Sequence, residues 1–421
     1  MINVNYSVGI NDNEIIDNAI KNRDADGIVV IPKRVSNIEP ERDYWLLDRA
    51  ITIPEDTTIV LQNCMLKLSD KCRDNFFRSA NCGLGIEDPE KISNIHIRGE
   101  GLCILQGADN PRATGDSSKI LANPCPFEPE DLCKYADWIP EERRTVETLE
   151  FWDAHNHSCG TDAGKEGESQ YGDWRGIGIL FANVDNFSIS NLKIVESHGW
   201  AISVEACTNG RIEKIEFDAR MSKMINGMRQ NMENQDGIDI RNGCHHIIIS
   251  DITGKTGDDV IALTAIAKPE EYRPGGSFRS THVMHNDWSR RERDIHDIVI
   301  RNVIAYSHLC FTLRMLPANA KIYNIIADGI IDVASKDKDQ YGTMSLGDGG
   351  YGINYPDGLR SVTFSNIVCN SNHAIVIGEY LKDSIITNVI NKNPDCETLE
   401  IAREDGLENV IISNICQYTK E

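Results

Sequence analysis

The chain lacks long apolar runs and is poor in positive charge. No run approaches the ~20 apolar residues of a membrane-spanning helix, so we expect no membrane partner. Lys and Arg number 43 against 65 Asp and Glu, which gives a formal net charge of −22. Nucleic acid and anionic membranes carry negative charge themselves, so the composition argues against both as partners.

The chain also lacks a paired-cysteine pattern and a recognisable export signal. Its 13 cysteines are an odd number with no C-x-x-C pair, which favours free thiols scattered as small apolar residues in a reducing compartment. The opening segment 1–6 has neither a basic stretch nor an apolar one of signal-peptide type. We therefore expect a cytoplasmic protein. No spacing fits a strong metal-binding pattern, so we expect neither a metal nor another cofactor.

Helical periodicity is nearly absent, and short β-rich runs recur instead. Each run is rich in Val and Ile and is followed by a small turn, often with Asn or Asp. Asn366 and Asn388 are 22 residues apart, and Asn388 and Asn414 are 26 apart. A period in the twenties with Asn at the turns is typical of a parallel β-solenoid, in which stacked asparagines can hydrogen-bond along the axis. The sequence predicts an all-β, right-handed parallel β-helix rather than an α/β fold.

Four segments depart from this repeat. Residues 11–22 carry Ile and Ala at helical spacing, which predicts a short helix that caps the first coil. Residues 108–175 and 265–294 do not fit the repeat, so we expect two excursions from a single domain spanning 1–421. Methionines recur at helical spacing over 221–232, which indicates a short helix packed on the coils.

Two acidic runs are the strongest functional signal. Asp236 lies 22 residues before Asp258, which is followed directly by Asp259, and an apolar strand follows each run. Positions one coil apart stack about 4.8 Å from each other, so we expect the three carboxylates on one outer face. Strand alternation also points Asp239 outward and Ile238 inward.

Carboxylates can have a structural or a chemical reason to gather. In the structural interpretation these acids only cap turns. In the chemical one, carboxylates this close cannot all ionise easily, so the pKa of at least one should rise, as a general acid requires. The regular one-coil spacing favours the second interpretation, acid/base work on a glycosidic bond.

The residues around these acids resemble glycoside hydrolase family 28, the polygalacturonase group. Members of that family carry N-T-D, G-D-D, G-H-G and R-I-K signatures on successive coils. Asn234–Asp236 looks like the first, with Gln in place of Thr, and Gly257–Asp259 matches the second. Glu196–Ser203 is similar to a serine-x-x-tryptophan strand of the family. The resemblance covers roughly residues 10–315 and implies a β-helical glycosidase.

The resemblance also implies roles for single residues. Asp258 would protonate the leaving oxygen, while Asp236 and Asp259 would hold and deprotonate a water on the opposite face, which inverts the anomeric centre. His308 would hydrogen-bond within this group, and Asn234 would orient its neighbours.

Two family signatures are altered here. His308 aligns with the third, but a Ser and a Leu replace its two glycines. No R-I-K follows, and Arg314 is the candidate substitute. The family's basic pair helps to hold a galacturonate carboxylate, so its absence weakens the case for a uronate. His198 and Trp174 complete the candidate substrate-binding residues. Trp174 is included because aromatic rings stack on sugars, while cover of the coils is the favoured alternative for this residue.

We therefore predict an inverting, exo-acting glycoside hydrolase that cleaves short oligosaccharides, such as pectin-derived ones, as a monomer or homo-oligomer. The missing export signal and a long excursion able to wall off one end of the cleft favour short substrates. Two alternatives remain: a β-helical polysaccharide lyase or glycosyl-transferring enzyme, and a non-catalytic carbohydrate-binding β-helix. The scarcity of basic residues beside the acids argues against a lyase.

Overall fold

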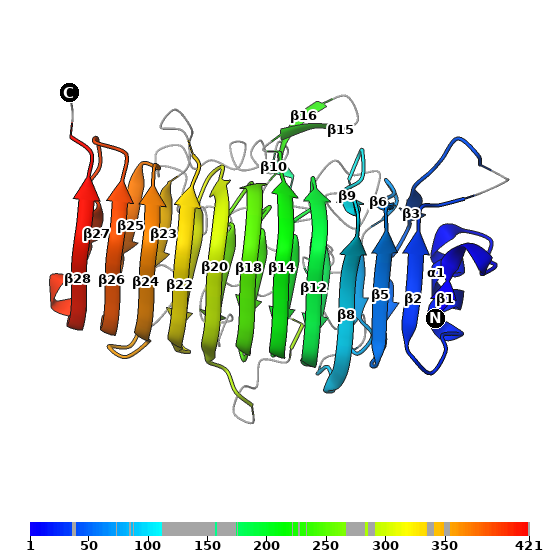
Figure 1. Ribbon diagram of the computed structural model, residues 1–421, viewed down its shortest axis with the longest axis horizontal. Coiled ribbons are helices and arrows are strands. Elements are labelled where there is room, and N and C mark those ends of the chain that lie inside the picture. The colour runs from blue at the N-terminus through cyan, green and yellow to red at the C-terminus, as the bar shows by residue number, and fades with distance from the viewer. Residues whose placement is uncertain are drawn as a thin grey trace, which may run out of the picture.

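Parallel strands stacked along one axis make up nearly all of the described molecule. The computed structural model describes residues 1–35, 39–72, 74–83, 86, 88–111, 156–157, 174, 176–220, 222–225, 228–232, 234–266, 283–284, 291–334, 341–348 and 354–419. Two sheets of parallel strands run along this axis, from the blue N-terminal coils to the red C-terminal coils (Figure 1). The predicted right-handed parallel β-helix is confirmed.

The first sheet has 15 strands and follows the order of the chain. Most coils contribute one long strand to it, and β12 and β14, for example, pair in parallel over nine residue pairs. Its strands are β1 (Ile2–Asn3), β2 (Ile28–Pro32), β3 (Trp45–Leu47), β5 (Thr57–Gln62), β6 (Met65–Leu68), β8 (Ile92–Glu100), β9 (Ile104–Gln106), β12 (Val184–Val195), β14 (Thr208–Asp218), β18 (His245–Thr256), β20 (Ile295–Ser307), β22 (Ile322–Asp332), β24 (Leu359–Cys369), β26 (Leu381–Asn391) and β28 (Leu407–Gln417).

The second sheet has 10 shorter strands, one from each of successive coils. A 3-10 turn, Glu404–Gly406, follows its last strand. Its strands are β4 (Ile51–Ile53), β7 (Phe77–Ser79), β11 (Ile179–Ala182), β13 (Ile202–Glu205), β17 (Ile238–Arg241), β19 (Ile261–Ile266), β21 (Phe311–Ala318), β23 (Gly342–Leu346), β25 (His373–Ile377) and β27 (Leu399–Ile401).

The core is a stack of apolar side chains that repeat at the same place on successive coils. In the first sheet, isoleucines pair in register from β8 to β20, and each is fully buried. Burial of apolar surface on every coil is the main force that holds such a solenoid together. The stacked residues are Ile97, Ile189, Ile212, Ile249 and Ile300.

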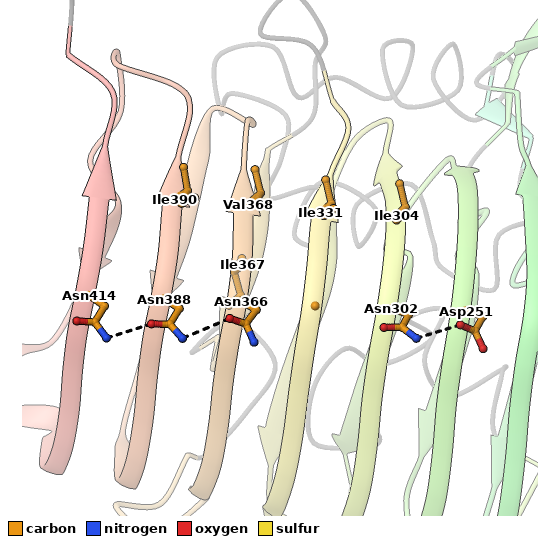
Figure 2. A pocket seen from close by; sticks show the side chains of 11 residues that line it. Asp251, Asn302, Ile304, Ile331, Asn366, Ile367, Val368, Asn388, Ile390 and Asn414 are labelled. Carbon is orange, nitrogen blue, oxygen red and sulfur yellow. Dashed lines mark hydrogen bonds between the residues drawn. The ribbon is translucent and has the colours of Figure 1, made fainter.

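An asparagine ladder runs along the outer face of the first sheet, as the repeat predicts. Its hydrogen bonds include Asn302 to Asp251 at 3.1 Å and Asn414 to Asn388 at 3.0 Å (Figure 2). Every residue of the ladder has a positive φ between 55 and 72°, a region that Asn, Asp and Gly tolerate best. The ladder consists of Asp251, Asn302, Gly329, Asn366, Asn388 and Asn414.

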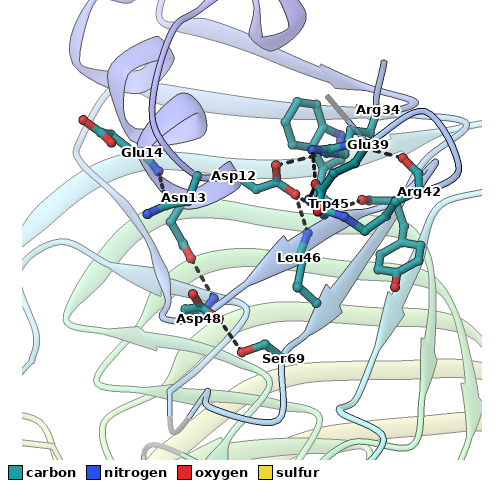
Figure 3. Close-up of polar contacts among 12 residues, drawn as sticks. Asp12, Asn13, Glu14, Arg34, Glu39, Arg42, Trp45, Leu46, Asp48 and Ser69 are labelled. Carbon is teal, nitrogen blue, oxygen red and sulfur yellow. Dashed lines mark hydrogen bonds and ion pairs between the residues drawn. The ribbon is translucent and has the colours of Figure 1, made fainter. Parts of the chain in front are cut away.

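The predicted N-terminal cap is confirmed. Helix α1 (Asp12–Lys21) begins after Asn11, whose side chain accepts a hydrogen bond from the Glu14 amide, and it follows a short 3-10 turn, Val4–Tyr6. Asp12 is buried and binds Arg34, Arg42 and the amide of Leu46, which fastens the helix to the first coil (Figure 3). This cap covers the end of the core that would otherwise face solvent.

The prediction of a helix over 221–232 is wrong. The described residues there form an antiparallel pair of strands, β15 (Ser222–Ile225) and β16 (Met228–Met232), and β16 also pairs with β10 (Asn156–His157). Only Asn226 and Gly227 lie between the two strands. Asn-Gly is the strongest two-residue hairpin signal, and it outweighs the helical spacing of the methionines.

Parts of the two expected excursions lie outside the described residues. The first, 108–175, is described only at 108–111, 156–157 and 174, and the second, 265–294, only at its ends and at 283–284. The assignment of the chain to one domain stays a prediction. Within the described part of the chain, no helix is long and apolar enough to cross a membrane.

Candidate active site

The two acidic runs meet where strands β17 and β19 of the second sheet begin. The amide of Gly237 donates to the carbonyl of Asp259 at 2.8 Å, and the register of the strands pairs Ile238 with Ile261. Continued back by two residues, this register sets Asp236 beside Asp259, with Asp258 at the turn. The expected one-coil separation is therefore confirmed, with a register of 261 − 238 = 23 residues rather than 22.

The carboxylate cluster, Asp236, Asp258 and Asp259, is held largely out of water. Asp236 is 6% exposed and Asp259 is 3% exposed, whereas Asp258 is half-buried. Burial raises the pKa of Asp236 well above its usual value, and the charges of Asp258, Asp239 and Asp259 raise it further. Burial also raises the pKa of Asp259, to about 7. Burial is thus the main cause of both raised pKa values, and the crowding that the sequence predicts adds to it.

Arg314 reaches this cluster from the next coil. Its Nη1 lies 3.4 Å from the Asp259 carboxylate and its Nη2 lies 2.7 Å from that of Asp348. The positive charge opposes the rise in the pKa of Asp259 that burial causes. Arg314 stacks in register after Ala262, which follows Asp239 in the same row of the sheet. The residue offered as the substitute for R-I-K thus lies at the cluster, already paired with two carboxylates.

A fourth carboxylate, Asp239, belongs to the same site and was not among the predicted catalytic residues. It is 1% exposed, and no described residue offers its Oδ2 a hydrogen bond. Burial raises its pKa well above the usual value, the neighbouring Arg241 lowers it, and the charges of Asp259 and Asp258 raise it again. The outward alternation of strand β17 was the signal that could have placed it here.

Cys310 is a second residue that the sequence did not single out. The Sγ atom and one carboxylate oxygen from each of Asp258 and Asp259 all lie within 4.8 Å of one another. Burial raises the pKa of the thiol first, and the charges of the two aspartates and a hydrogen bond to Asp258 raise it further. The thiol is therefore protonated at neutral pH and donates to Asp258. The only indication in the sequence that Cys310 lies near the acids was His308, two residues before it, which aligns with a family signature.

His308 lies at the turn next to the cluster. Its amide donates to the carbonyl of Thr256 at 2.9 Å, and Thr256 in turn donates its hydroxyl to the carbonyl of Asp258 at 2.5 Å. The half-buried ring of His308 packs edge-on against Tyr306, with 5.3 Å between ring centroids. The backbone thus places His308 on the coil that follows the acids, as the family resemblance implies, and its proposed role in tuning them stays a prediction.

Asn234 begins the first acidic run in a strained backbone conformation. Its φ is 52°, in the left-handed region that Asn tolerates better than most residues. The following residue, Gln235, is buried and donates from its side chain to the carbonyl of Ser197 at 2.7 Å. Its carbonyl accepts from the amides of Gly257 and Asp258. The first run is thus tied both to the coil before it and to the coil after it.

His198 and Trp174, predicted to bind substrate, are both buried in the structure. His198 is 4% exposed and its Nε2 accepts the amide of Ala108 at 2.9 Å. Trp174 is 1% exposed, and the guanidinium of Arg78 lies 5.2 Å over its ring. Neither side chain can contact a sugar in this arrangement. They fasten the two described ends of the first excursion to the coils instead, which for Trp174 is the alternative that sequence reasoning left open.

Comparisons with known proteins single out the same segment. The profile of glycosyl hydrolases family 28 matches residues 164–270, which include the carboxylate cluster but neither His308 nor Arg314. No curated protein sequence matches the chain. The matched segment is thus the part of the chain on which the predicted acid/base chemistry depends.

Solved structures share the fold at low identity. An exopolygalacturonase from Thermotoga maritima is 15% identical, with 96% of this chain and 87% of that chain covered and a TM-score of 0.49. PfbA, a surface adhesin of Streptococcus pneumoniae, is 11% identical over 99% and 91% of the two chains, with a TM-score of 0.50. A tailspike protein of E. coli bacteriophage HK620 is 11% identical over 100% of this chain and 63% of that one, with a TM-score of 0.53.

At such identities the likeness to the adhesin and the tailspike supports the fold alone, and it does not decide between catalysis and binding. The family profile is more specific, because it matches the coils that bring the three carboxylates together. On that evidence the resemblance predicted from the sequence is supported over residues 164–270, where the chain matches the profile of glycosyl hydrolases family 28.

Proposed function

We propose that the protein is an inverting glycoside hydrolase that acts on short oligosaccharides from one end. The observation that supports this most is the buried carboxylate cluster, in which the pKa of Asp236 and that of Asp259 are raised. A glycosidase needs one protonated carboxyl and one carboxylate at the same pH. Coupled acids in a buried site supply both, because the first proton to leave makes the next one harder to remove.

The roles within the cluster follow the family resemblance. Asp258 is the least buried of the three and lies at the turn, where a leaving group can reach it, so it is the proposed general acid. Asp236 and Asp259 would hold the attacking water. Arg314 supports this division, because its charge favours the ionised form of Asp259, and a general base has to be ionised to accept a proton.

The proposal of short substrates depends on the first excursion. Its two described ends, Ala108 and Trp174, lie on the coils just before the acids. Ala108 is bound by His198, and the carbonyl of Trp174 accepts from Asn75 at 2.8 Å. We infer from the length of the insertion between these two ends that it would close one end of the substrate-binding site. A closed end selects for chain termini and so for exo-action.

The test is hydrolysis of a panel of pectin-derived and neutral oligosaccharides, with the anomer of the first product read by NMR. Inversion gives a product of opposite anomeric configuration to the bond cleaved. The variant Asp258→Asn should lower turnover by roughly 10²–10⁴-fold, the usual contribution of a general acid. Near-normal turnover in that variant would refute the assignment of Asp258.

Asp251→Asn is the matched control for this substitution. Asp251 lies on the outer face of the first sheet, in a ladder whose other side chains are asparagines, so the change should leave both fold and activity intact. A product with a new double bond, seen as ultraviolet absorbance, would instead identify a lyase. Binding of a sugar by the wild-type protein without any turnover would identify a non-catalytic β-helix.

A further inference from the structure

The thiol of Cys310 changes what the carboxylate cluster can bind. Cys310 comes from the coil after Asp258 and Asp259, and its Sγ lies within 4.8 Å of a carboxylate oxygen from each. Two carboxylates alone suit hard cations such as Mg²⁺ or Ca²⁺, which prefer oxygen ligands. A thiolate beside them shifts the preference to softer ions, of which Zn²⁺ combines with sulfur and carboxylate oxygen most readily in proteins.

Asp236 gives independent evidence that the site is prepared for a ligand. Asp236 is only 6% exposed, and its Oδ1 has no hydrogen-bond partner among the described residues. Leaving a buried carboxylate oxygen unpaired is costly. The register of β17 and β19 sets Asp236 beside Asp259, one of the two carboxylates at the thiol. A cation bound at Asp258 and Asp259 would give this oxygen a partner.

The backbone holds the candidate ligands in place. The amide of Phe311, next to Cys310, donates to Oδ1 of Asp259 at 2.9 Å. The amide of Asp259 donates to Oδ1 of Asp258 at 3.0 Å. Such secondary contacts orient ligands and are characteristic of metal sites that bind well. Among the described cations Arg314 is the one paired directly with the cluster, so the negative charge there is only partly balanced.

We propose that Asp258, Asp259 and Cys310 form a binding site for a soft divalent cation such as Zn²⁺ or Cd²⁺, and that the bound ion inhibits the enzyme. The ion takes the place of the thiol proton, which passes to solvent, and Asp258 ceases to be available as a proton donor. The ion is thus an inhibitor and not a cofactor. The inhibitory part of this inference rests on the proposed function, whereas the binding part does not.

Cadmium is the best probe, because a Cd²⁺–thiolate bond absorbs in the ultraviolet whether or not the protein is active. The wild-type protein should bind Cd²⁺ with the appearance of this absorbance, and isothermal titration should give the affinity. Cys310→Ser keeps a hydrogen-bond donor for Asp258 but removes the soft ligand. We expect it to weaken Cd²⁺ binding by more than the roughly 10-fold typical of losing an outer-shell partner, and to lose the absorbance of this site.

Cys416→Ser is the matched control. Cys416 is exposed near the C-terminus on strand β28, far along the axis from the acids. Its removal should therefore leave the high-affinity binding of Cd²⁺ unchanged. Asp259→Asn should weaken binding without abolishing the thiolate absorbance. Identical titrations and spectra for the wild-type protein and Cys310→Ser would overturn the proposed site.

Inhibition is measured separately on whichever substrate the oligosaccharide panel yields. Zn²⁺ should inhibit the wild-type protein at lower concentration than it inhibits Cys310→Ser. Equal inhibition of both would refute the inhibitory role, even if Cd²⁺ binding depends on Cys310. If the panel yields no turnover, the proposed function fails while the spectroscopic test of the metal site still stands, so the two failures are distinguishable.

Discussion

The outer faces of the two sheets differ in whether the same residue types recur on successive coils. On the first sheet one position carries Asp, Asn or Gly on every coil from β18 to β28, always with a positive φ. On the second sheet the equivalent outer row changes with every coil, as Ser203, Asp239, Ala262 and Arg314 show. The first pattern repeats because each coil needs the same bend. The second does not repeat, and it includes the part of the molecule where the buried acids with raised pKa values lie.

The largest effects should follow from removing charge at the non-repeating site. Asp236→Asn should lower turnover by roughly 10²–10⁴-fold, because it removes a carboxylate proposed to hold the attacking water. The same change should stabilise the fold at neutral pH. Residues that serve catalysis often lower the stability of the fold, and a buried carboxyl with one oxygen that lacks a described hydrogen-bond partner is an example.

The gain in stability should depend on pH in a defined direction. The folded-state pKa of Asp236 is raised well above its ordinary value, so the folded state holds this proton more tightly than the unfolded state. Below the unfolded pKa both states are protonated and the group costs little. As pH rises through and above that value, the wild-type protein loses stability while the neutral Asn does not.

Thermal unfolding of both proteins over a pH series from about 4 to about 8 tests this. The melting temperature of Asp236→Asn should exceed that of the wild type by a margin that grows with pH. A margin that is constant or that shrinks with rising pH would show that the Asp236 carboxyl is not held protonated by burial. Asp251→Asn, on the exposed ladder, should show no such growth.

A core position should respond next most strongly. Ile212 is fully buried and stacks between Ile189 and Ile249. Ile212→Ala should destabilise the protein by about 2–5 kcal/mol, because it removes apolar contact with both neighbouring coils and leaves a cavity. Ile304→Ala is the control, since Ile304 is 48% exposed on the outer face of the same sheet and should cost no more than about 0.5 kcal/mol. Similar free energies of unfolding for both variants, measured in urea, would contradict the assigned alternation.

The repeat predicted the fold because it is a property of local sequence. Val and Ile at alternate positions, and Asn at each bend, report inward and outward directions without knowledge of the rest of the chain. The ladder residue Asn388 was found in this way, and the capping helix was found from its own helical spacing. The hairpin of β15 and β16 was misjudged because methionine spacing was given more weight than the Asn-Gly between the strands.

The site was predictable only where its residues fit a spaced pattern. Asp236, Asp258 and Asp259 were found because two runs lie one coil apart. Cys310 has no such partner in the sequence, and its position beside Asp258 depends on the path of the chain from β20 to β21. The burial of Trp174 and of His198 was equally hidden, since it results from how the first excursion is attached to the coils.

The smallest effect should come from the repeating face, and it can separate backbone strain from hydrogen bonding. Asn388 donates to Asn366 at 3.3 Å, accepts from Asn414 at 3.0 Å and has a φ of 56°. Asn388→Ala loses both hydrogen bonds and places a Cβ-bearing residue without polar compensation in the left-handed region, at a cost of about 1–2 kcal/mol. Asn388→Gly loses the same hydrogen bonds but adopts this φ without strain.

We therefore expect the glycine variant to be the more stable of the two in urea denaturation. Gly329 already shows that the ladder accepts glycine, since it occupies the same row with a φ of 72°. If Asn388→Gly proved as unstable as Asn388→Ala, the hydrogen bonds rather than the backbone conformation would be what keeps Asn on successive coils. The repeating face would then depend on contacts between side chains, as the non-repeating face does, and the contrast between the two would lie in the charge of those contacts alone.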